Sequence, residues 1–420
     1  MSGISRRGVL SGAAGLSAAA AAGACGANAS AEAKPAAAPA YVKGLPDVVI
    51  AGAGVFGAWT ALSLVEKGAK VLLVDAYGPG NARQTSGDET RQIRYAYGED
   101  EIYSRWAYRA LQLWTERQEE FGRDMIYRNG VLAADSPMDK VETETAIFRK
   151  LGIPYEILKQ DELRARWPQA RWDDVDYALY EPEAGTVKAR ESIVAVSEVF
   201  RQKGGAVRIG YATPGASAGG KLTDVVLGDG ERLSAGKFLF ACGPWLPTVL
   251  PDILDGYIRL RRSEVFYIGS PRGDDSYSYR KLPNMWEPYS GAYAMSDIDY
   301  GYKVVPRFGV EMDPDTDERV VSTYLIDKAR DYLKRRLPGL AGQPVVASRV
   351  CVLENSNNHH YIIDTHPDYE NMWVAGAGSG HAFKMGPMLG EYVSERVIGT
   401  PDDPAVRALF ALDTHGPVEA

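Results

Sequence analysis

A glycine-rich turn between two short apolar runs constrains this chain more than any other feature. The first run covers residues 47–51, and Gly52-Ala53-Gly54-Val55-Phe56-Gly57 follows it directly as G-x-G-x-x-G. An amphipathic stretch then continues to Lys67, and residues 71–75 form a second apolar run that ends in Asp75. This order of strand, turn, helix and strand predicts a complete βαβ unit at the start of a parallel, Rossmann-like sheet.

Each glycine of the turn has a predicted role in binding a dinucleotide. The first permits a tight turn, the second lets a pyrophosphate approach the backbone, and the third allows close packing of helix and strand. The start of the helix offers unpaired N–H groups to phosphates, and an acid about 20 residues past the first glycine can bind ribose hydroxyls. The predicted dinucleotide-binding residues are therefore Gly52, Gly54, Val55, Phe56, Gly57 and Asp75. This unit alone does not distinguish FAD from NAD.

Length, composition and charge exclude several other classes of protein. The 420 residues predict two domains, and 45% apolar with 24% charged residues is the balance of a globular protein. Lys and Arg total 47 against 55 for Asp and Glu, so the acidic chain is not expected to bind nucleic acid. Three scattered cysteines are too few for a disulfide framework or a zinc site. The histidines lack ligand partners at standard spacings, so no metal site is expected.

The first 44 residues are interpreted as an export signal and a linker. Arg6 and Arg7 precede a weakly apolar, Ala-rich run over residues 9–22, which resembles a twin-arginine signal. Small-x-small sites follow it, so we expect cleavage, no stable membrane insertion, and a periplasmic or secreted product. Lipid anchoring at Cys25 is less favoured, because Ala22 occupies a position usually filled by Leu. The alternative is a flexible Ala-rich tail with chance arginines.

The rest of the chain predicts a second domain inserted into the first. Helices are expected over residues 101–121 and 192–203, with strands over 206–211, 237–241 and 127–134, the last containing a turn at Asn129-Gly130. Residues 257–346 carry short aromatic and β-branched runs between turn residues, which is typical of an antiparallel sheet. The predicted nucleotide-binding domain comprises residues 45–127, 185–257 and 348–405. The predicted substrate domain comprises residues 128–184 and 258–347, and residues 406–420 form a tail.

Three segments carry a resemblance to one family. They cover residues 87–99 (Gly-Asp-Glu-Thr-Arg-Gln-Ile-Arg-Tyr-Ala-Tyr-Gly-Glu), residues 349–351 leading on to 361–367, and residues 376–384 (Gly-Ala-Gly-Ser-Gly-His-Ala-Phe-Lys). With the βαβ unit they look like the monomeric sarcosine oxidase family of the D-amino-acid oxidase superfamily. The resemblance implies an α/β plus β fold, in which a Rossmann-like FAD-binding domain holds an inserted antiparallel-sheet substrate domain. It also implies FAD rather than NAD.

The resemblance assigns cofactor contacts to several residues. Cys351 matches the position where family members attach FAD covalently through a thioether, and a nearby cation such as Arg349 would lower the thiol pKa. The alternative is an ordinary buried cysteine. Arg91 is placed beside the flavin, and the turn that contacts it contains Gly378, Gly380, His381 and Lys384.

The resemblance also implies a cationic substrate pocket. Arg94 and Lys384 would bind a substrate carboxylate, and Lys303 would promote the reaction with oxygen. Arg307 stands where sarcosine oxidases have a histidine, and Glu89 is inserted into the family's Gly-Asp-Thr-Arg run. These two departures put a sarcosine-like substrate in doubt. We expect the reduced flavin, the FAD pyrophosphate and the substrate carboxylate to balance the cations.

The expected function is the oxidation of a small amine that bears a carboxylate, with oxygen as acceptor and hydrogen peroxide as product. A monomer is compatible with the resemblance. One alternative is a dehydrogenase that passes electrons to a periplasmic acceptor. Another is a flavin-binding tailoring partner without turnover of its own. An NAD-dependent dehydrogenase fits least, because nothing in residues 351–384 serves a nicotinamide.

Overall fold

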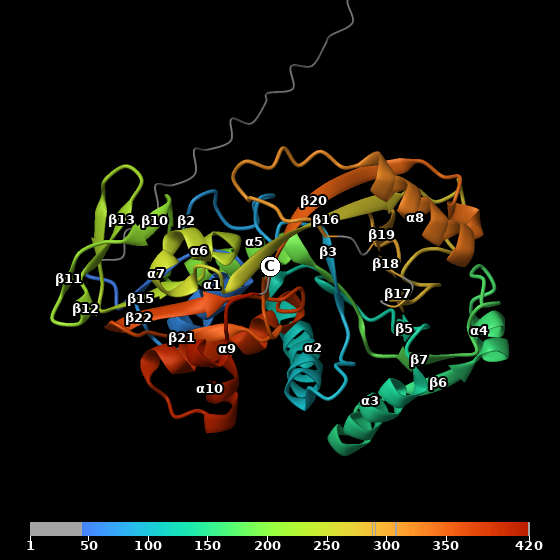
Figure 1. Ribbon diagram of the computed structural model, residues 1–420, viewed down its shortest axis with the longest axis horizontal. Coiled ribbons are helices and arrows are strands. Elements are labelled where there is room, and N and C mark those ends of the chain that lie inside the picture. Colours follow the sequence, from blue (N-terminus) through green and yellow to red (C-terminus); the bar gives the residue numbers. More distant parts are fainter. Residues whose placement is uncertain (1–43, 288, 290, 307–308, 419–420) are drawn as a thin grey trace, which may run out of the picture. The chain divides into compact units, whose positions relative to one another are not determined.

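The predicted βαβ unit lies at the centre of a parallel sheet in the computed structural model, which describes residues 44–287, 289, 291–306 and 309–418 (Figure 1). It comprises β1 (Val48–Ala51), α1 (Val55–Glu66) and β2 (Val71–Asp75), as predicted. The strand order of the whole sheet is β21-β22-β15-β1-β2-β9. Its other strands are β9 (Ala206–Ile209), β15 (Lys237–Phe240), β21 (Ile362–His366) and β22 (Tyr369–Gly376).

This six-stranded sheet is parallel except at one edge, where β21 pairs antiparallel with β22. Parallel strands are buried on both faces, which explains the uninterrupted apolar runs of β1 and β15. Helix α1 packs against α5 (Ala189–Gln202) and α9 (Gly386–Ile398). Helix α2 (Glu101–Phe121), which has the predicted bounds, packs on α9 in turn.

The second large sheet has eight strands in the order β20-β16-β19-β18-β17-β5-β7-β6. All neighbours pair antiparallel except β17 and β5, which are parallel. The strands are β5 (Val131–Ala133), β6 (Glu156–Lys159), β7 (Tyr177–Glu181), β16 (Ile258–Ile268), β17 (Asn284–Glu287), β18 (Ala292–Met295), β19 (Tyr302–Pro306) and β20 (Val345–Ser356).

One expectation for this region was wrong. Residues 257–346 are not only strands, because α8 (Thr323–Arg336) forms a helix within them and buries Leu325, Ala329 and Leu333 at helical spacing. The strand expected over residues 127–134, with its turn at Asn129-Gly130, forms β4 (Ile126–Tyr127) and β5 on either side of that turn. Gly130 has a left-handed backbone (φ 76°) in this turn, and a Cβ there would lie 2.4 Å from the ring of Tyr180.

The remaining strands form three small sheets. Their orders are β3-β8-β4, β10-β13-β14 and β11-β12. The strands are β3 (Thr90–Ile93), β8 (Gly185–Lys188), β10 (Ala212–Pro214), β11 (Ser217–Ala218), β12 (Lys221–Leu222), β13 (Asp224–Leu227) and β14 (Arg232–Ser234). The remaining α-helices are α3 (Met138–Leu151), α4 (Gln160–Arg166), α6 (Leu246–Val249), α7 (Pro251–Leu254) and α10 (Pro404–Phe410).

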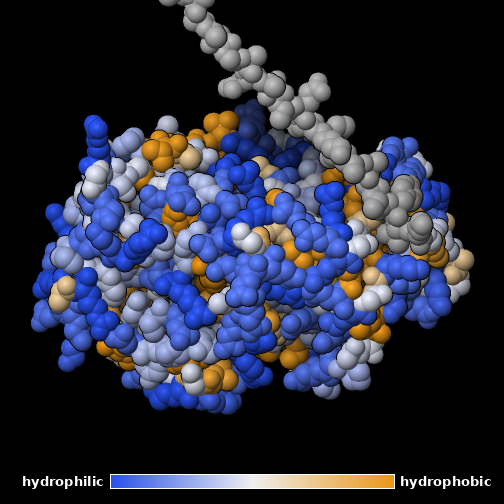
Figure 2. Space-filling view, turned by 180° about the vertical axis from the view of Figure 1, so that it is seen from behind, coloured by the Kyte–Doolittle hydropathy of each residue, from blue (hydrophilic) through white to orange (hydrophobic). Residues whose placement is uncertain are grey.

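Strands β16 and β20 form a long antiparallel ribbon at the edge of the eight-stranded sheet. Figure 1 shows the ribbon arching from α6 and α7, beside the six-stranded sheet, to α8. Cys351 lies near its middle, opposite Ser263. The face seen in Figure 2 is mostly hydrophilic, with hydrophobic residues in small groups. Across the described residues, no helix is long and apolar enough to cross a membrane.

Candidate functional site

A cavity of about 390 Å³ opens at the carboxyl end of β1, beside the glycine-rich turn. Gly52 has φ 102°, and a Cβ there would lie 2.2 Å from the carbonyl oxygen of Ala241. Gly57 packs so closely that a Cβ would lie 1.8 Å from the carbonyl oxygen of Gly52. At Gly54 the nearest atom to a Cβ is Ser86 Oγ, at 3.8 Å, so the backbone there faces open space. The turn thus has the tight bend, the close packing and the exposed backbone that a pyrophosphate requires.

Asp75 lines the same cavity but is already bound by the protein. Its two carboxylate oxygens accept from the backbone N–H of Ala53 at 2.7 Å and of Tyr77 at 2.9 Å, and from Gln84 Nε2 at 3.2 Å. Burial raises the pKa of its carboxyl group, although these hydrogen bonds act to lower it. Asp75 therefore stabilises the two turns that shape this end of the cavity, in addition to its predicted role toward ribose hydroxyls.

Several buried polar atoms of the cavity wall have no hydrogen-bond partner within the described residues. They are Gln84 Oε1, Thr85 Oγ1 and Glu354 Oε2, and all three residues line the cavity. Buried polar atoms are normally paired, so unpaired ones at a cavity indicate a polar ligand. Val55 and Phe56 line the cavity as well. Together with the glycine turn, these residues fit a dinucleotide such as FAD.

The turn that follows β22 forms another part of the cavity wall. Ala377, Ser379 and Gly380 have positive φ angles of 55°, 47° and 74°, an unusual run of left-handed residues that bends the chain sharply. Gly378 and Gly380 line the cavity with His381. The His381 ring is held on both nitrogens, since Nε2 donates to the carbonyl of His359 (3.0 Å) and Nδ1 accepts from Tyr361 Oη (2.8 Å). Burial lowers the pKa of His381 to about 3, so the ring stays neutral.

A buried ionic cluster lies beside this cavity, centred on Asp88. Lys303 Nζ and Arg91 Nη1 each donate to Asp88 Oδ2 at 2.6 Å, and Tyr267 Oη donates to Oδ1 at 2.7 Å. We call these four residues the Asp88 cluster. The side chains of Lys303 and Asp88 are 1% and 0% exposed, whereas Arg91 lines the cavity. Sequence reasoning missed Asp88 as a site residue, although it stands within the Gly-Asp-Glu-Thr-Arg segment.

The protonation of the Asp88 cluster follows from its charges. Burial alone would raise the pKa of Asp88, but Lys303 and Arg91 outweigh it and hold that pKa well below its usual range. Burial lowers the pKa of Lys303, while Asp88 opposes that effect. The expectation that cofactor and substrate alone balance the cations was therefore incomplete. One protein carboxylate faces two cations here, and one positive charge remains in excess.

Cys351 lies next to the Asp88 cluster, as the resemblance implies. Burial raises the pKa of its thiol, while Arg91 and Lys303 act in the opposite direction. Arg349 was the wrong candidate for this effect, because it pairs with Glu89. The inserted Glu89 also forms an ion pair with Arg190, at 3.4 Å, so its carboxylate is bound by two arginines of the protein. Among the described residues no cation acts on Cys242, and burial raises the pKa of its thiol to about 12.

Arg94 and Lys384 come from distant segments and converge on Tyr97. Lys384 Nζ donates to Tyr97 Oη at 2.9 Å, and the Arg94 guanidinium lies 4.8 Å from the centre of the Tyr97 ring. The same guanidinium stacks on Trp286, at 4.1 Å. No ion pair joins Arg94 or Lys384 to a carboxylate among the described residues. Burial, and then Arg94, lowers the pKa of Lys384 well below its usual value, although the buried Glu181 acts in the opposite direction.

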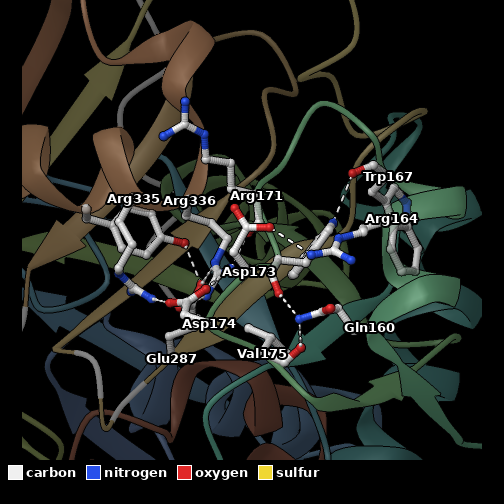
Figure 3. Close-up of polar contacts among 12 residues, drawn as sticks. Gln160, Arg164, Trp167, Arg171, Asp173, Asp174, Val175, Glu287, Arg335 and Arg336 are labelled. Carbon is white, nitrogen blue, oxygen red and sulfur yellow. Dashed lines mark hydrogen bonds and ion pairs between the residues drawn. The ribbon is translucent and has the colours of Figure 1, made fainter.

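A second buried ionic cluster stands next to Trp286 in the chain (Figure 3). Glu287 accepts from Arg336 at 3.0 Å on each oxygen, from Arg335 Nη2 at 2.9 Å and from Tyr332 Oη at 3.1 Å. Arg336 also binds Asp174 at 2.9 Å. These five residues form the Glu287 cluster. It fastens the end of β17 to α8, and so fixes the strand that presents Trp286 to Arg94.

The structure thus brings the predicted residues together in two groups, one around Asp88 and one around Tyr97. They lie close enough that Arg91 contributes to lowering the pKa of Lys384. Arg307 lies outside the described residues, so its placement stays a prediction. Trp286, Tyr97 and Glu354 were not predicted as site residues. Aromatic and acidic residues are too common in cores for sequence spacing to mark them.

Comparison with known proteins gives matches along almost the whole described chain. The family described as FAD dependent oxidoreductase matches residues 47–396. A monomeric sarcosine oxidase from Bacillus sp. (strain B-0618) is 28% identical, over 83% of this chain and 91% of its own. An N-methyl-L-tryptophan oxidase from Salmonella arizonae is also 28% identical, over 83% of this chain and 94% of its own.

Solved structures support the same fold. The L-proline dehydrogenase of P. horikoshii superposes with a TM-score of 0.77 at 18% identity, covering 88% of this chain and 97% of its own. A fructosyl peptide oxidase gives the same TM-score at 19% identity, covering 87% and 93%. The glycine turn at the end of β1 and the unpaired polar atoms of the cavity agree with these matches. The chain therefore belongs to the FAD dependent oxidoreductase family and has the D-amino-acid oxidase-like fold.

Proposed function

We propose that this protein is a flavoprotein oxidase that converts a carboxylate-bearing amine to an imine and reduces oxygen to hydrogen peroxide. The substrate class is an N-alkyl, cyclic or glycated amino acid. The names of its relatives support this class, since they include oxidases of sarcosine and N-methyl-L-tryptophan. The observation that carries the proposal is the convergence of Arg94 and Lys384 on Tyr97 without a carboxylate partner among the described residues.

Arg94 and Lys384 bind the substrate carboxylate in this proposal. A guanidinium can pair with a carboxylate through two parallel hydrogen bonds, and stacking on Trp286 fixes its plane. Burial disfavours the charged form of Lys384. An arriving carboxylate adds to the opposing effect of Glu181 and favours the ammonium, so binding of an acid is selected over binding of its ester or amide.

FAD, when bound, supplies the two-electron oxidation of the amine and passes the electrons to oxygen. The chain contributes the charge of the Asp88 cluster. Lys303 is held in one position by Asp88 and by the carbonyl of Thr90, at 2.6 and 2.7 Å. A preorganised cation beside the reacting oxygen stabilises the negative charge that develops there. The amine loses two electrons and two protons to give the imine, and oxygen gains two electrons and two protons to give hydrogen peroxide.

A dehydrogenase is the second candidate, and one observation favours it. Burial lowers the pKa of Lys303, and the less this side chain is charged, the less it promotes the reaction with oxygen. Electrons would then pass to a different acceptor. Hydrogen peroxide formation in air, measured against turnover with an artificial electron acceptor, separates the two candidates.

The test of the proposed function is a spectrum of the purified protein without oxygen. N-methyl amino acids, cyclic imino acids, D-amino acids and glycated amino acids are added in turn, each beside its methyl ester. Bleaching of the flavin by an acid but not by its ester supports the proposal. Bleaching by esters and acids alike would show that Arg94 and Lys384 do not bind a carboxylate, and no bleaching by any amine would contradict the proposed reaction.

Covalent attachment of FAD through Cys351 is part of the proposal. It is supported by the position of this thiol beside Arg91 and Lys303, whose charges favour the thiolate although burial and Asp88 raise its pKa. Acid-precipitated protein is expected to stay yellow, whereas the Cys351→Ala variant releases its flavin into the supernatant. Cys242→Ala is the matched control and keeps the flavin bound. Free flavin from the unmutated protein would contradict the attachment.

Export by a twin-arginine signal is proposed for the first 44 residues, on the strength of Arg6 and Arg7 before the Ala-rich run. These residues lie almost entirely outside the described part of the chain. Fractionation of cells that express the protein is expected to place it in the periplasm or medium. The double change of Arg6 and Arg7 to Lys then retains it in the cytoplasm. Export of that variant would show that another route is used.

A further inference from the structure

Glu354 is a buried acid that the proposed function leaves unused. It lies near the end of β20, and only 4% of the residue is exposed. The backbone N–H of Gly378 donates to its Oε1 at 3.4 Å, and Oε2 has no hydrogen-bond partner in the described part of the chain. No ion pair involves Glu354 within those residues either. Burial raises the pKa of its carboxyl group to about 7.

The carboxyl group faces the cavity between two glycines. A Cβ on Gly378 would lie 3.2 Å from Oε1, and a Cβ on Gly243 would lie 3.5 Å from Oε2. Both glycines line the cavity with Glu354. The Cβ of Gly378 would also lie 3.6 Å from the ring of Phe56, at the start of α1. Glu354 therefore stands next to the glycine-rich turn on one side.

Along β20 on the other side, Glu354 is three residues from Cys351. A strand rises about 3.3 Å per residue, so the two positions are about 10 Å apart. The proposed flavin ring lies at Cys351, and the pyrophosphate lies at the turn. The part of the dinucleotide between them is a chain that carries several hydroxyl groups and no charge.

We propose that Glu354 binds this hydroxylated chain of FAD through its unpaired carboxyl oxygen. A carboxyl group with no cation nearby is costly to bury unless it gains hydrogen bonds. Hydroxyl groups supply them, because each can both donate and accept. The inference rests on the proposed FAD site and adds a residue that neither the resemblance nor the comparisons assign.

The experiment measures binding of two ligands to the full chain. It uses the Cys351→Ala background, in which the flavin exchanges, after the flavin has been removed. FAD binding is followed by fluorescence, and ADP binding by competition with FAD. ADP carries the diphosphate and adenosine but lacks the hydroxylated chain. The variants are Glu354→Gln, which keeps a donor and an acceptor, and Glu354→Leu, which keeps neither.

Glu354→Leu is expected to weaken FAD binding about tenfold or more, the effect of leaving buried groups unpaired, while ADP binds as in the parent. Unchanged ADP binding also shows that the variant is folded. Glu354→Gln is expected to bind FAD within about threefold of the parent. Glu144→Leu is the matched control. Glu144 is also buried with one unpaired carboxyl oxygen, but it does not line the cavity.

Two results would overturn the inference alone. One is Glu354→Leu binding FAD as tightly as the parent. The other is an equal loss of FAD and ADP affinity, which would place the contact at the diphosphate or show a general effect on the fold. A parent that binds no FAD would overturn the proposed function together with the inference, so the two failures are distinguishable.

Discussion

The Asp88 cluster and the Glu287 cluster have the same core, a buried carboxylate with two cations and a tyrosine, but different charge balance. In the Glu287 cluster, Asp174 supplies a second carboxylate, so two acids face two arginines. In the Asp88 cluster, one acid faces Lys303 and Arg91. A balanced cluster serves packing, whereas an excess charge beside a cavity attracts an anion. Charge balance and access to a cavity, rather than burial, distinguish the candidate site from the structural cluster.

The prediction with the largest expected effect concerns a variant that disrupts the Glu287 cluster, in which the charges are balanced. Glu287→Ala removes the buried partner of Arg335 and Arg336 and leaves them only the partly exposed Asp174, although the Arg336 side chain is just 1% exposed. We expect the free energy of unfolding, measured in urea, to fall by about 3–5 kcal/mol, the cost of an uncompensated buried charge. Asp174→Ala is the control, because the Asp174 side chain is 43% exposed, and it is expected to cost about 1 kcal/mol or less. Equal losses of unfolding free energy in the two variants would mean that burial of the carboxylate does not determine how much its removal destabilises the protein.

The second prediction changes the unbalanced cluster. Lys303→Met removes the charge and keeps the length, while Asp88 keeps Arg91 and Tyr267 as partners. Reoxidation of the reduced flavin by oxygen is expected to slow by roughly 10²–10³-fold or more, since a preorganised charge is lost. Anaerobic reduction by substrate changes far less. Stopped-flow absorbance measures both half-reactions, and equal damage to both would indicate a structural lysine.

The third prediction concerns the cations that have no carboxylate partner among the described residues. Arg94→Met and Lys384→Met are each expected to weaken binding of the acid substrate by at least about 2 kcal/mol, because one partner of a buried charge pair is lost. Binding of the methyl ester should hardly change. Substrate titration of the flavin spectrum measures both ligands. Arg105→Met on the exposed face of α2 is the control, and a similar loss for acid and ester would contradict carboxylate binding.

The smallest effect concerns Glu181, another buried acid, which makes no ion pair among the described residues. Burial raises the pKa of its carboxyl group to about 7, above the ordinary 4.5. Folding therefore favours its protonated form, and this contribution to stability is lost as pH rises from about 4.5 to about 7. Between pH 5 and pH 7, the free energy of unfolding of Glu181→Gln, measured in urea, should rise by about 1–2 kcal/mol relative to that of the wild type. A constant difference between the two proteins would show that Glu181 does not titrate there.

Much of this arrangement follows from sequence, and the rest depends on contacts between distant residues. The βαβ unit is local, so apolar runs and glycine spacing were enough to predict β1, α1 and β2. Helix α8 was missed because the aromatic and β-branched runs around it suggested only strands. Asp88 was missed because a counter-ion is defined by what lies near it in space. Its partner Lys303 is 215 residues away in the chain.

The ribbon of β16 and β20 has a consequence for how the protein responds to its cofactor. Cys351 belongs to the eight-stranded sheet through β20, whereas the glycine-rich turn belongs to the six-stranded sheet through β1. A cofactor bonded covalently to Cys351 and bound at the glycine-rich turn would crosslink these two sheets, which share no hydrogen-bonded strand pair among the described residues. With the cofactor bound, the two sheets would then unfold in one transition of a calorimetric scan. The Cys351→Ala protein without flavin would unfold them in separate transitions.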